Sequence, residues 1–307
     1  MLAPLEEAVR TLSLASLGPT AHLRAIGWDV YPFQDFLYSS YNVPTMMVAA
    51  RQVGKTHGIG GLAYHIAKTV PGSLGAIVCP DQDKSKTLIS RTKMIGDRDG
   101  AVWAPDNTEE LGLGESRVVG LPGTVKGVVS RSAKLLVFDE AGLMLGTQGR
   151  ELYAAATPMQ AHVENPLTFA ISSAWWQEGW FWDEWSTGKA YRKVLVLPRW
   201  TLDPNRRRII PVEKTDAELR KEWRAKGVEA FYADTPTKTF MEQELERHPE
   251  YYMRQQYLCE FLEKQSKVFQ SVWFDKALTD EVEPLFGSVE EAGAAEEEGS
   301  IMADVLG

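Results

Sequence analysis

The stretch Met46–Gly61, MMVAARQVGKTHGIGG, decides the fold class of this 307-residue chain. An apolar run leads into Gly-Lys-Thr at 54–56, and a segment that permits a helix follows. A strand, a tight loop and a helix in this order form a phosphate cradle, because the N–H groups of the loop and of the helix N-terminus point at the phosphates. The stretch departs from the pattern G-x-x-x-x-G-K-S/T at one place, since Ala49 stands where the first glycine is expected.

A second motif, KLLVFDEAG at 134–142, supplies the carboxylates that such a cradle needs. Its run of four apolar residues predicts a buried strand that ends in Asp139 and Glu140. We expect Asp139 to hold the water shell of Mg²⁺, and Glu140 to orient or deprotonate an attacking water. Asp139 lies 84 residues after Lys55, which leaves room for the other elements of one α/β domain. An ordinary strand with an acidic loop is the alternative for this motif alone, whereas the two motifs together predict a nucleotide hydrolase.

The loop residues divide the expected contacts with ATP and Mg²⁺. Lys55 is expected at the β- and γ-phosphates, and the hydroxyl of Thr56 at Mg²⁺. The backbone of Gln52, Val53 and Gly54 is expected to complete the cradle.

The composition is that of an ordinary globular protein, with 44% hydrophobic and 24% charged residues. No apolar stretch reaches the roughly 18 residues of a membrane span, and an N-terminus with Glu6 and Glu7 lacks the basic start of a signal peptide. Cys79 and Cys259 lie far apart without His partners, so neither a disulfide framework nor a metal site is predicted from them. These features favour a reducing cytoplasm and no membrane partner.

The net charge of −9 is concentrated near one end of the chain. Residues 275–307 hold ten acidic residues and one basic residue, which alone gives −9, so the first 274 residues are neutral overall. Within those, residues 189–226 hold twelve basic and five acidic residues, a local excess of seven positive charges. This basic stripe is able to meet nucleic-acid phosphates, and a solvated helical face explains it equally well.

Apolar runs alternate with helical or loop segments between residues 44 and 198. The alternation predicts a mostly parallel α/β sheet covered by helices on both faces, with ligands beyond the carboxyl ends of the strands. The runs that we expect to be strands are 45–50, 74–79, 117–121, 134–138, 167–172 and 193–197.

Four segments are expected along the chain. Polar helical periodicity over 213–227 and 241–262 predicts a small helical subdomain after the sheet. The closing apolar run SIMADVLG at 300–307 predicts the start of another domain. The expected segments are an N-terminal helical part at 1–30 with two helices around Gly18-Pro19, a P-loop ATPase core at 31–200, a helical linker subdomain at 201–265, and a linker with an acidic tail at 266–307.

Five segments in order carry a resemblance to one family: Tyr31-Pro-Phe-Gln34, AARQVGKT at 49–56, LLVFDEAG at 135–142, TFAISSA at 168–174 with Trp185 beyond it, and Tyr257-Leu-Cys-Glu-Phe261. On these segments the chain resembles, over about residues 28–265, the large terminase subunit of tailed bacteriophages, the motor that packages DNA into capsids. The second segment is similar to that family's P-loop, in which an Arg lies inside the cradle and the first Gly is often absent. The resemblance implies a P-loop NTPase fold of the RecA/ASCE type.

The resemblance also implies roles for individual residues. It implies that Arg51 contacts the γ-phosphate and that Gln34 contacts adenine. It implies that Ser172 and Ser173 sense the γ-phosphate, although polar residues at a strand end are also commonly structural. In a homo-oligomeric ring a neighbouring subunit would contribute a further Arg, for which Arg131 is the best candidate, with an ordinary solvated loop Arg as the alternative.

The implied activity is ATP hydrolysis that drives double-stranded viral DNA into a procapsid. The implied partners are double-stranded DNA, the portal protein and the small terminase subunit, in the host cytoplasm and transiently at the procapsid portal. In this family a nuclease half of RNase H-like fold follows the ATPase half, and Asp304 resembles its first metal-binding acid. Because two-metal cleavage needs a cluster of carboxylates, we expect no nuclease activity from this chain.

Two other functions are compatible with the motifs. A helicase of superfamily 1 or 2 shares them, but it needs a second RecA-like domain of about 150 residues. A nucleotide-binding scaffold for capsid assembly is the non-enzymatic alternative.

The aromatic run at 175–185 favours packing over base stacking. His57 and His65 are interpreted as ordinary helix residues.

Overall fold

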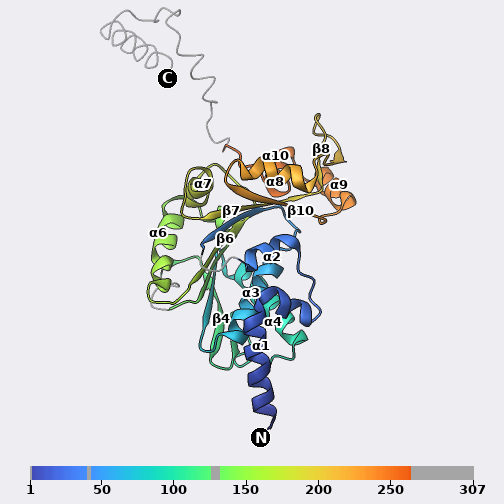
Figure 1. Ribbon diagram of the computed structural model, residues 1–307. Helices are drawn as coiled ribbons and strands as arrows, with labels where there is room; N and C mark the ends of the chain where they lie inside the picture. The colour runs from blue at the N-terminus through green and yellow to red at the C-terminus, as the bar shows by residue number, and fades with distance from the viewer. Residues whose placement is uncertain (1, 40–42, 126–131, 264–307) are drawn as a thin grey trace, which may run out of the picture. The chain divides into compact units, whose positions relative to one another are not determined.

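The computed structural model of the chain describes residues 2–39, 43–125 and 132–263, which belong to one compact unit, Met1–Glu263. An eight-stranded sheet runs through this unit in the order β10-β7-β1-β6-β5-β2-β4-β3 (Figure 1). Every neighbouring pair of strands is parallel except β3 and β4. The strands are β1 (Thr45–Ala49), β2 (Leu74–Cys79), β3 (Glu110–Leu113), β4 (Ser116–Pro122), β5 (Leu135–Asp139), β6 (Leu167–Ser172), β7 (Arg192–Pro198) and β10 (Val228–Ala233).

The expected mostly parallel α/β sheet is confirmed. Each of the six apolar runs forms a strand within one or two residues of its expected bounds, as β1, β2, β4, β5, β6 and β7. Strands of a parallel sheet are buried on both faces, so their sequences read as continuous apolar runs. In β1 and β5 every residue is buried, which accounts for the clarity of these two signals.

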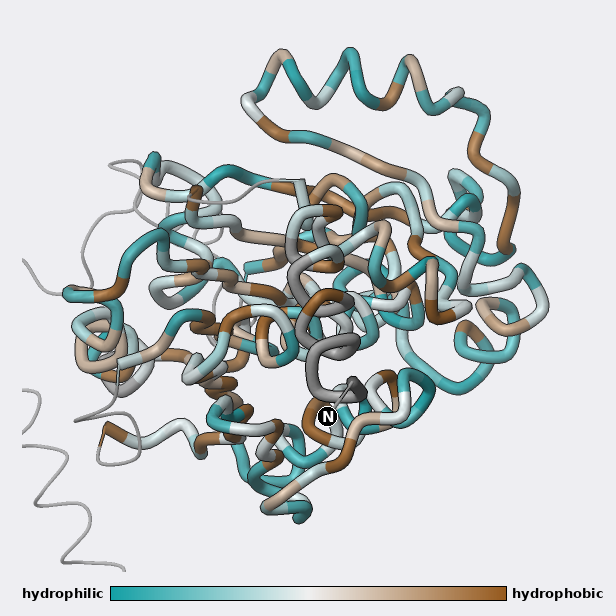
Figure 2. The backbone as a smooth tube through the Cα atoms, turned by 60° about the horizontal axis from the view of Figure 1, so that its bottom comes forward, coloured by the Kyte–Doolittle hydropathy of each residue, from teal (hydrophilic) through white to brown (hydrophobic). Residues whose placement is uncertain are grey.

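Helices cover both faces of the sheet (Figure 1). One face carries α1 (Leu2–Ala25), α2 (Pro32–Tyr38), α3 (Lys55–Thr69) and α4 (Gln82–Arg98), and the other carries α6 (Gly146–Ala156) and α7 (Gly179–Ser186). Side chains of β1 alternate between two cores, since Met47 and Ala49 pack with α3 while Met46 and Val48 pack with α6 and α7. In Figure 2 the strongly hydrophobic segments accordingly gather in the interior of the fold.

The N-terminal segment contains two helices, as its sequence predicts. Within α1 the backbone is non-helical at Gly18, with φ 77° and ψ 171°, and Pro19 begins the second helical part. Among the described residues, the structure contains no helix long and apolar enough to cross a membrane.

The chain after β7 is less helical than expected. The expected periodicity is confirmed by α8 (Asp216–Arg224), α9 (Lys238–Arg247) and α10 (Glu250–Gln256), but β10 lies between them and extends the main sheet alongside β7. A hairpin of β8 (Trp200–Leu202) and β9 (Ile209–Pro211) packs with α9 and α10 around a small core of its own. The described part of the segment 201–265 therefore contributes both to the main sheet and to a separate small core.

Three glycines in α3 let neighbouring elements approach the helix closely. A Cβ atom would lie 3.0 Å from Gln34 Cγ at Gly58, 3.2 Å from the backbone N of Thr92 at Gly60, and 2.8 Å from Leu23 Cδ1 at Gly61. A glycine inside a helix is about 1 kcal/mol less favourable than alanine. The packing of α1, α2 and α4 against α3 offsets this cost and fixes the start of α3.

Gln34 ties α2 to the loop before α3. Its side chain is fully buried, its Oε1 accepts a hydrogen bond from the Tyr31 N–H at 3.0 Å, and its Nε2 donates to the Gly54 carbonyl at 3.0 Å. Both ends of the amide are therefore occupied within the protein, and the loop is held by them.

We predict that Gln34→Glu lowers the free energy of unfolding by about 2 kcal/mol, because the variant loses the donor to Gly54 and buries a carboxylate. Urea unfolding without added ligand measures the change. Gln177→Glu is the matched control, since Gln177 is exposed and donates one hydrogen bond to the Phe261 carbonyl. Equal stability of Gln34→Glu and the wild type would contradict the role in holding the loop.

A buried polar network joins α1, α3 and the end of α4. His22 Nδ1 lies 2.9 Å from His65 Nδ1, His22 Nε2 lies 3.4 Å from Asp99 Oδ2, and the Tyr64 hydroxyl donates to Asp99 Oδ2 at 2.5 Å. Burial, followed by the charge of His22, lowers the pKa of His65 from 6.5 to about 3. His65 is therefore neutral in the folded protein near neutral pH.

This shift predicts that the protein loses stability as the pH falls from about 6.5 towards about 3. In that window the unfolded chain binds a proton at His65 that the folded chain does not, so acid favours unfolding. Urea unfolding at a series of pH values tests this, with His65→Asn as the variant that cannot titrate. A wild-type pH slope no steeper than that of His65→Asn would contradict the assignment.

Candidate functional site

The loop between β1 and α3 is shaped by its backbone. Gly54 has φ 94°, a left-handed conformation that glycine adopts without strain, and α3 begins at the next residue. The first N–H groups of a helix have no partner within the helix, so they are available to phosphate oxygens. Two hydrogen bonds from later parts of the chain hold this loop in place. The Arg51 N–H donates to the Gln256 carbonyl at 2.7 Å, and the Thr235 hydroxyl donates to the Gln52 carbonyl at 2.9 Å. Val53 is fully buried beneath it.

Lys55 lies where the loop, β1 and β6 meet. Only 7% of the residue is exposed, and its Nζ donates to the carbonyls of Ala49 at 3.2 Å and Ala50 at 3.1 Å and to Ser173 Oγ at 3.3 Å. The strand order places β6 between β1 and β5. The structure thus brings Ser173 to the P-loop lysine, while the role of Ser173 as a sensor stays a prediction.

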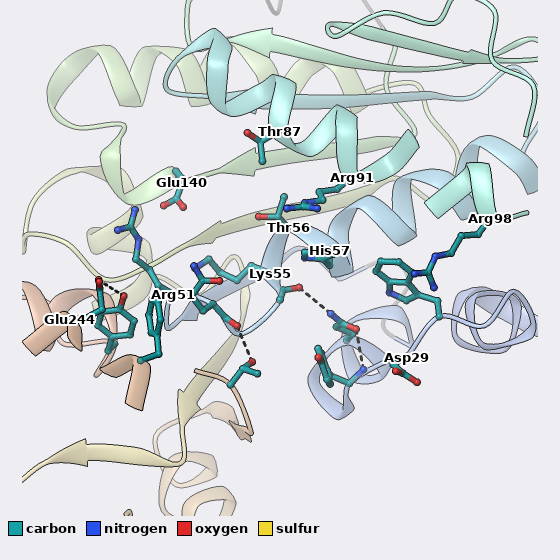
Figure 3. Close-up of a pocket in the computed structure, with 18 of the residues that line it drawn as sticks. Asp29, Arg51, Lys55, Thr56, His57, Thr87, Arg91, Arg98, Glu140 and Glu244 are labelled. Atoms are coloured by element: carbon teal, nitrogen blue, oxygen red, sulfur yellow. Dashed lines mark hydrogen bonds between the residues drawn. The ribbon is translucent and has the colours of Figure 1, made fainter. Parts of the chain in front are cut away.

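The two acids stand at the carboxyl end of β5. Asp139 is 5% exposed and its Oδ1 accepts the Glu140 N–H at 2.9 Å. Burial and then the charge of Glu140 raise the pKa of Asp139, and Lys55 opposes that shift. Glu140 adopts a left-handed conformation, with φ 50°, and its side chain lines the same cavity as Lys55 (Figure 3).

A cavity of about 870 Å³ opens over the loop and the first turn of α3. Among the expected site residues, Gln34, Arg51, Gln52, Gly54, Lys55, Thr56 and Glu140 line it. Further lining residues were not predicted, because they belong to segments without a motif and reach the cavity only through tertiary packing; among them are Trp28, Thr87, Arg91, Arg98 and Glu244.

Two expected site residues have unforeseen surroundings. The Arg51 guanidinium donates to the hydroxyl of Tyr252 in α10 and lies 5.9 Å from the centroid of that ring, so α10 holds this side chain. Ser172 Oγ is buried at the end of β6 and has no hydrogen-bond partner among the described residues. The contacts of Arg51, Ser172 and Gln34 with a nucleotide stay predictions.

Two of the other sequence candidates, Arg131 and Asp304, lie outside the described residues. Six of the twelve cations of the basic stripe are paired with acids, which favours the solvated-face interpretation for those six. The pairs are Arg199 with Asp216 and Asp234, Arg206 with Glu250, Arg208 with Asp203, Lys214 and Lys226 with Glu222, and Arg224 with Glu229.

The donors beside Lys55 fit Mg²⁺. Thr56 and Asp139 offer a hydroxyl and a carboxylate, and Mg²⁺ prefers oxygen ligands and is usually held by one or two carboxylates together with substrate phosphates. Among the described residues there is no cluster of three or more His, Cys, Asp or Glu side chains that would hold a metal ion by itself. A cation at this site would therefore depend on the nucleotide for its remaining ligands.

No model of a known protein family matches the chain, and no curated protein sequence matches it significantly. Solved structures do match. The large terminase ATPase domain of Thermus phage P74-26 is 15% identical with a TM-score of 0.56, over 79% of this chain and 98% of that chain. A mutant of the same domain is 16% identical with a TM-score of 0.54 over the same shares.

The large terminase of bacteriophage HK97 is 18% identical with a TM-score of 0.52, over 76% of this chain and 51% of that chain. The matched part of HK97 terminase is thus about half of its length. A likeness at such low identity is one of fold. The described chain has the fold of the ATPase domain of phage large terminases.

Proposed function

We propose that this chain is a motor ATPase that hydrolyses ATP and thereby drives double-stranded viral DNA into a procapsid. The observation that carries the proposal is the convergence on one cavity of Lys55, fixed by Ser173, and of Glu140, from three adjacent strand ends. The fold shared with terminase ATPase domains supports the same proposal.

Phosphoryl transfer depends mainly on positioning and on charge neutralisation, and different residues of this chain carry out these two tasks. The N–H groups at the start of α3 bind phosphate oxygens, and Lys55 binds the β- and γ-phosphates. Thr56, and Asp139 through its water shell, would hold Mg²⁺, which would neutralise negative charge on the phosphate oxygens. Glu140 faces the cavity and orients the attacking water or accepts its proton (Figure 3).

The remaining roles complete the proposal. Arg51 contacts the γ-phosphate after leaving Tyr252, Gln34 contacts adenine after releasing Tyr31 or Gly54, and Ser172 and Ser173 report the presence of the γ-phosphate. Subunits form a homo-oligomeric ring in which Arg131 of one subunit completes the site of the next. The partners are the portal protein, the small terminase subunit and double-stranded DNA, in the host cytoplasm and at the procapsid portal.

Two substitutions separate binding from hydrolysis. Lys55→Ala removes the buried cation and should weaken ATP binding about 100-fold or more, whereas Glu140→Gln should keep ATP affinity and lower turnover by a similar factor. Calorimetric titration measures the affinities, and phosphate release measures turnover. Unchanged turnover in Glu140→Gln would favour a nucleotide-binding scaffold instead.

The coupled activity has a separate test. With procapsids and linear duplex DNA, the chain should consume ATP while DNA becomes protected from added nuclease, and Glu140→Gln should protect none.

The helicase alternative predicts ATP-dependent strand separation without procapsids. Residues 199–263 do not support the helicase alternative. They form the hairpin, three helices and one more strand of the same sheet, and not a second α/β domain. Strand separation in place of DNA protection would contradict the packaging function.

A further inference from the structure

One face of α4 borders the cavity although no motif marks it. Thr87, Arg91 and Arg98 line the cavity, and their spacing of four and seven residues places them on the same side of the helix. Figure 3 shows the Arg91 side chain reaching from α4 towards Thr56 and His57, on the other side of Lys55 from Arg51. The cavity thus has arginine side chains on both sides of the P-loop lysine.

The position of Arg91 is fixed by close packing. A Cβ atom at Gly60 of α3 would lie 3.3 Å from both the carbonyl carbon and the Cβ of Arg91, so the backbone of α4 lies against α3 at this residue. On the same side, the Trp28 ring stacks on His57 at 5.8 Å, and the Arg98 guanidinium lies 4.8 Å from the Trp28 centroid. Arg91 therefore projects into the cavity from a helix, α4, whose backbone is packed against α3.

Within the part of the chain that the structure describes, Arg91 differs from the other cations of α4 in having no oxygen partner. Lys84, Lys86 and Lys93 each pair with a carboxylate, and Arg98 donates to the Gly27 carbonyl at 3.2 Å. The half-buried Arg91 makes one weak contact, from Nη1 to Met94 Sδ at 3.9 Å, and no ion pair within the described residues. A guanidinium has five N–H donors, so Arg91 is supplied with donors and lacks acceptors.

The residues around Arg91 indicate which kind of acceptor would bind its free N–H donors. Burial, followed by the charge of Arg91, lowers the pKa of His57, so near neutral pH the positive charge on this side comes from Arg91 and Arg98. The N-terminus of α3 and Lys55 favour an anion in the same cavity. A phosphate group presents several oxygens in a geometry that a guanidinium binds in bidentate fashion.

We propose that Arg91 is a second phosphate-binding arginine of this chain, which contacts the phosphate groups of the nucleotide from the α4 side while Arg51 approaches from the α10 side. This inference rests on the proposed function, because it requires a nucleotide in the cavity. It assigns a binding role to a residue outside every sequence motif of the site.

Calorimetric titration with ATP and with adenosine tests the proposal. Arg91→Ala should weaken ATP binding by about 10- to 100-fold, the usual effect of losing a hydrogen bond to a charged group, and leave adenosine binding unchanged. Arg91→Lys should fall between Arg91→Ala and the wild type, since it keeps the charge without the bidentate geometry. Lys93→Ala is the matched control on the same helix, because Lys93 pairs with Asp97 and Asp106 and does not line the cavity.

The outcomes separate this inference from the proposed function. Unchanged ATP affinity in Arg91→Ala, together with loss of ATP binding in Lys55→Ala, would overturn the role of Arg91 alone. Equal weakening for ATP and adenosine would also overturn it, because Arg91 would then shape the cavity instead of binding phosphate. Absence of ATP binding by the wild type would overturn both. Thermal unfolding of each variant shows whether a change in affinity reflects a loss of fold.

Discussion

The position of one buried ammonium group governs the rest of this site. An isolated buried charge is strongly unfavourable, so the Lys55 Nζ needs acceptors around it. It has the Ala49 and Ala50 carbonyls and the Ser173 hydroxyl, which are available together only where β1 ends next to β6. This constraint fixes the loop, the start of α3 and the neighbour of β1, and it brings the positive charge to the floor of the cavity.

Strand order then places the acids. Because β6 separates β1 from β5, Asp139 and Glu140 stand two strands away from β1, and Ser172 and Ser173 at the end of β6 lie between the loop and the acids. The raised pKa of Asp139 reflects its burial, and Lys55 compensates part of that cost. The braces from Gln256 and Thr235 connect the same loop to the segment after β7. A displacement of the loop would therefore break or shift its hydrogen bonds to α10 and to the residues that follow β10.

Sequence alone predicts the parts whose physics is local. A fully buried strand such as β5 shows as an unbroken apolar run, and the loop at 51–56 shows as a motif, because both depend on neighbouring residues. β10 was missed because Glu229 and Tyr232 interrupt its apolar pattern and helices flank it. Arg91 was missed because only the packing of α4 on Gly60 brings it to the cavity. Gln34 was expected at adenine; its bond to the Tyr31 N–H is local to the start of α2, whereas its bond to the Gly54 carbonyl arises from a tertiary contact that no sequence pattern encodes.

The central claim is that the cavity over α3 is the site at which ATP is bound for hydrolysis. An experimental structure of Glu140→Gln with ATP and Mg²⁺ tests it most directly. We expect phosphate oxygens at the N–H groups of residues 54–56, with Lys55 Nζ turned from the Ala49 and Ala50 carbonyls towards them. Nucleotide phosphates bound elsewhere, or Lys55 still bound to both carbonyls beside a bound nucleotide, would show that this cavity is not the site of ATP hydrolysis.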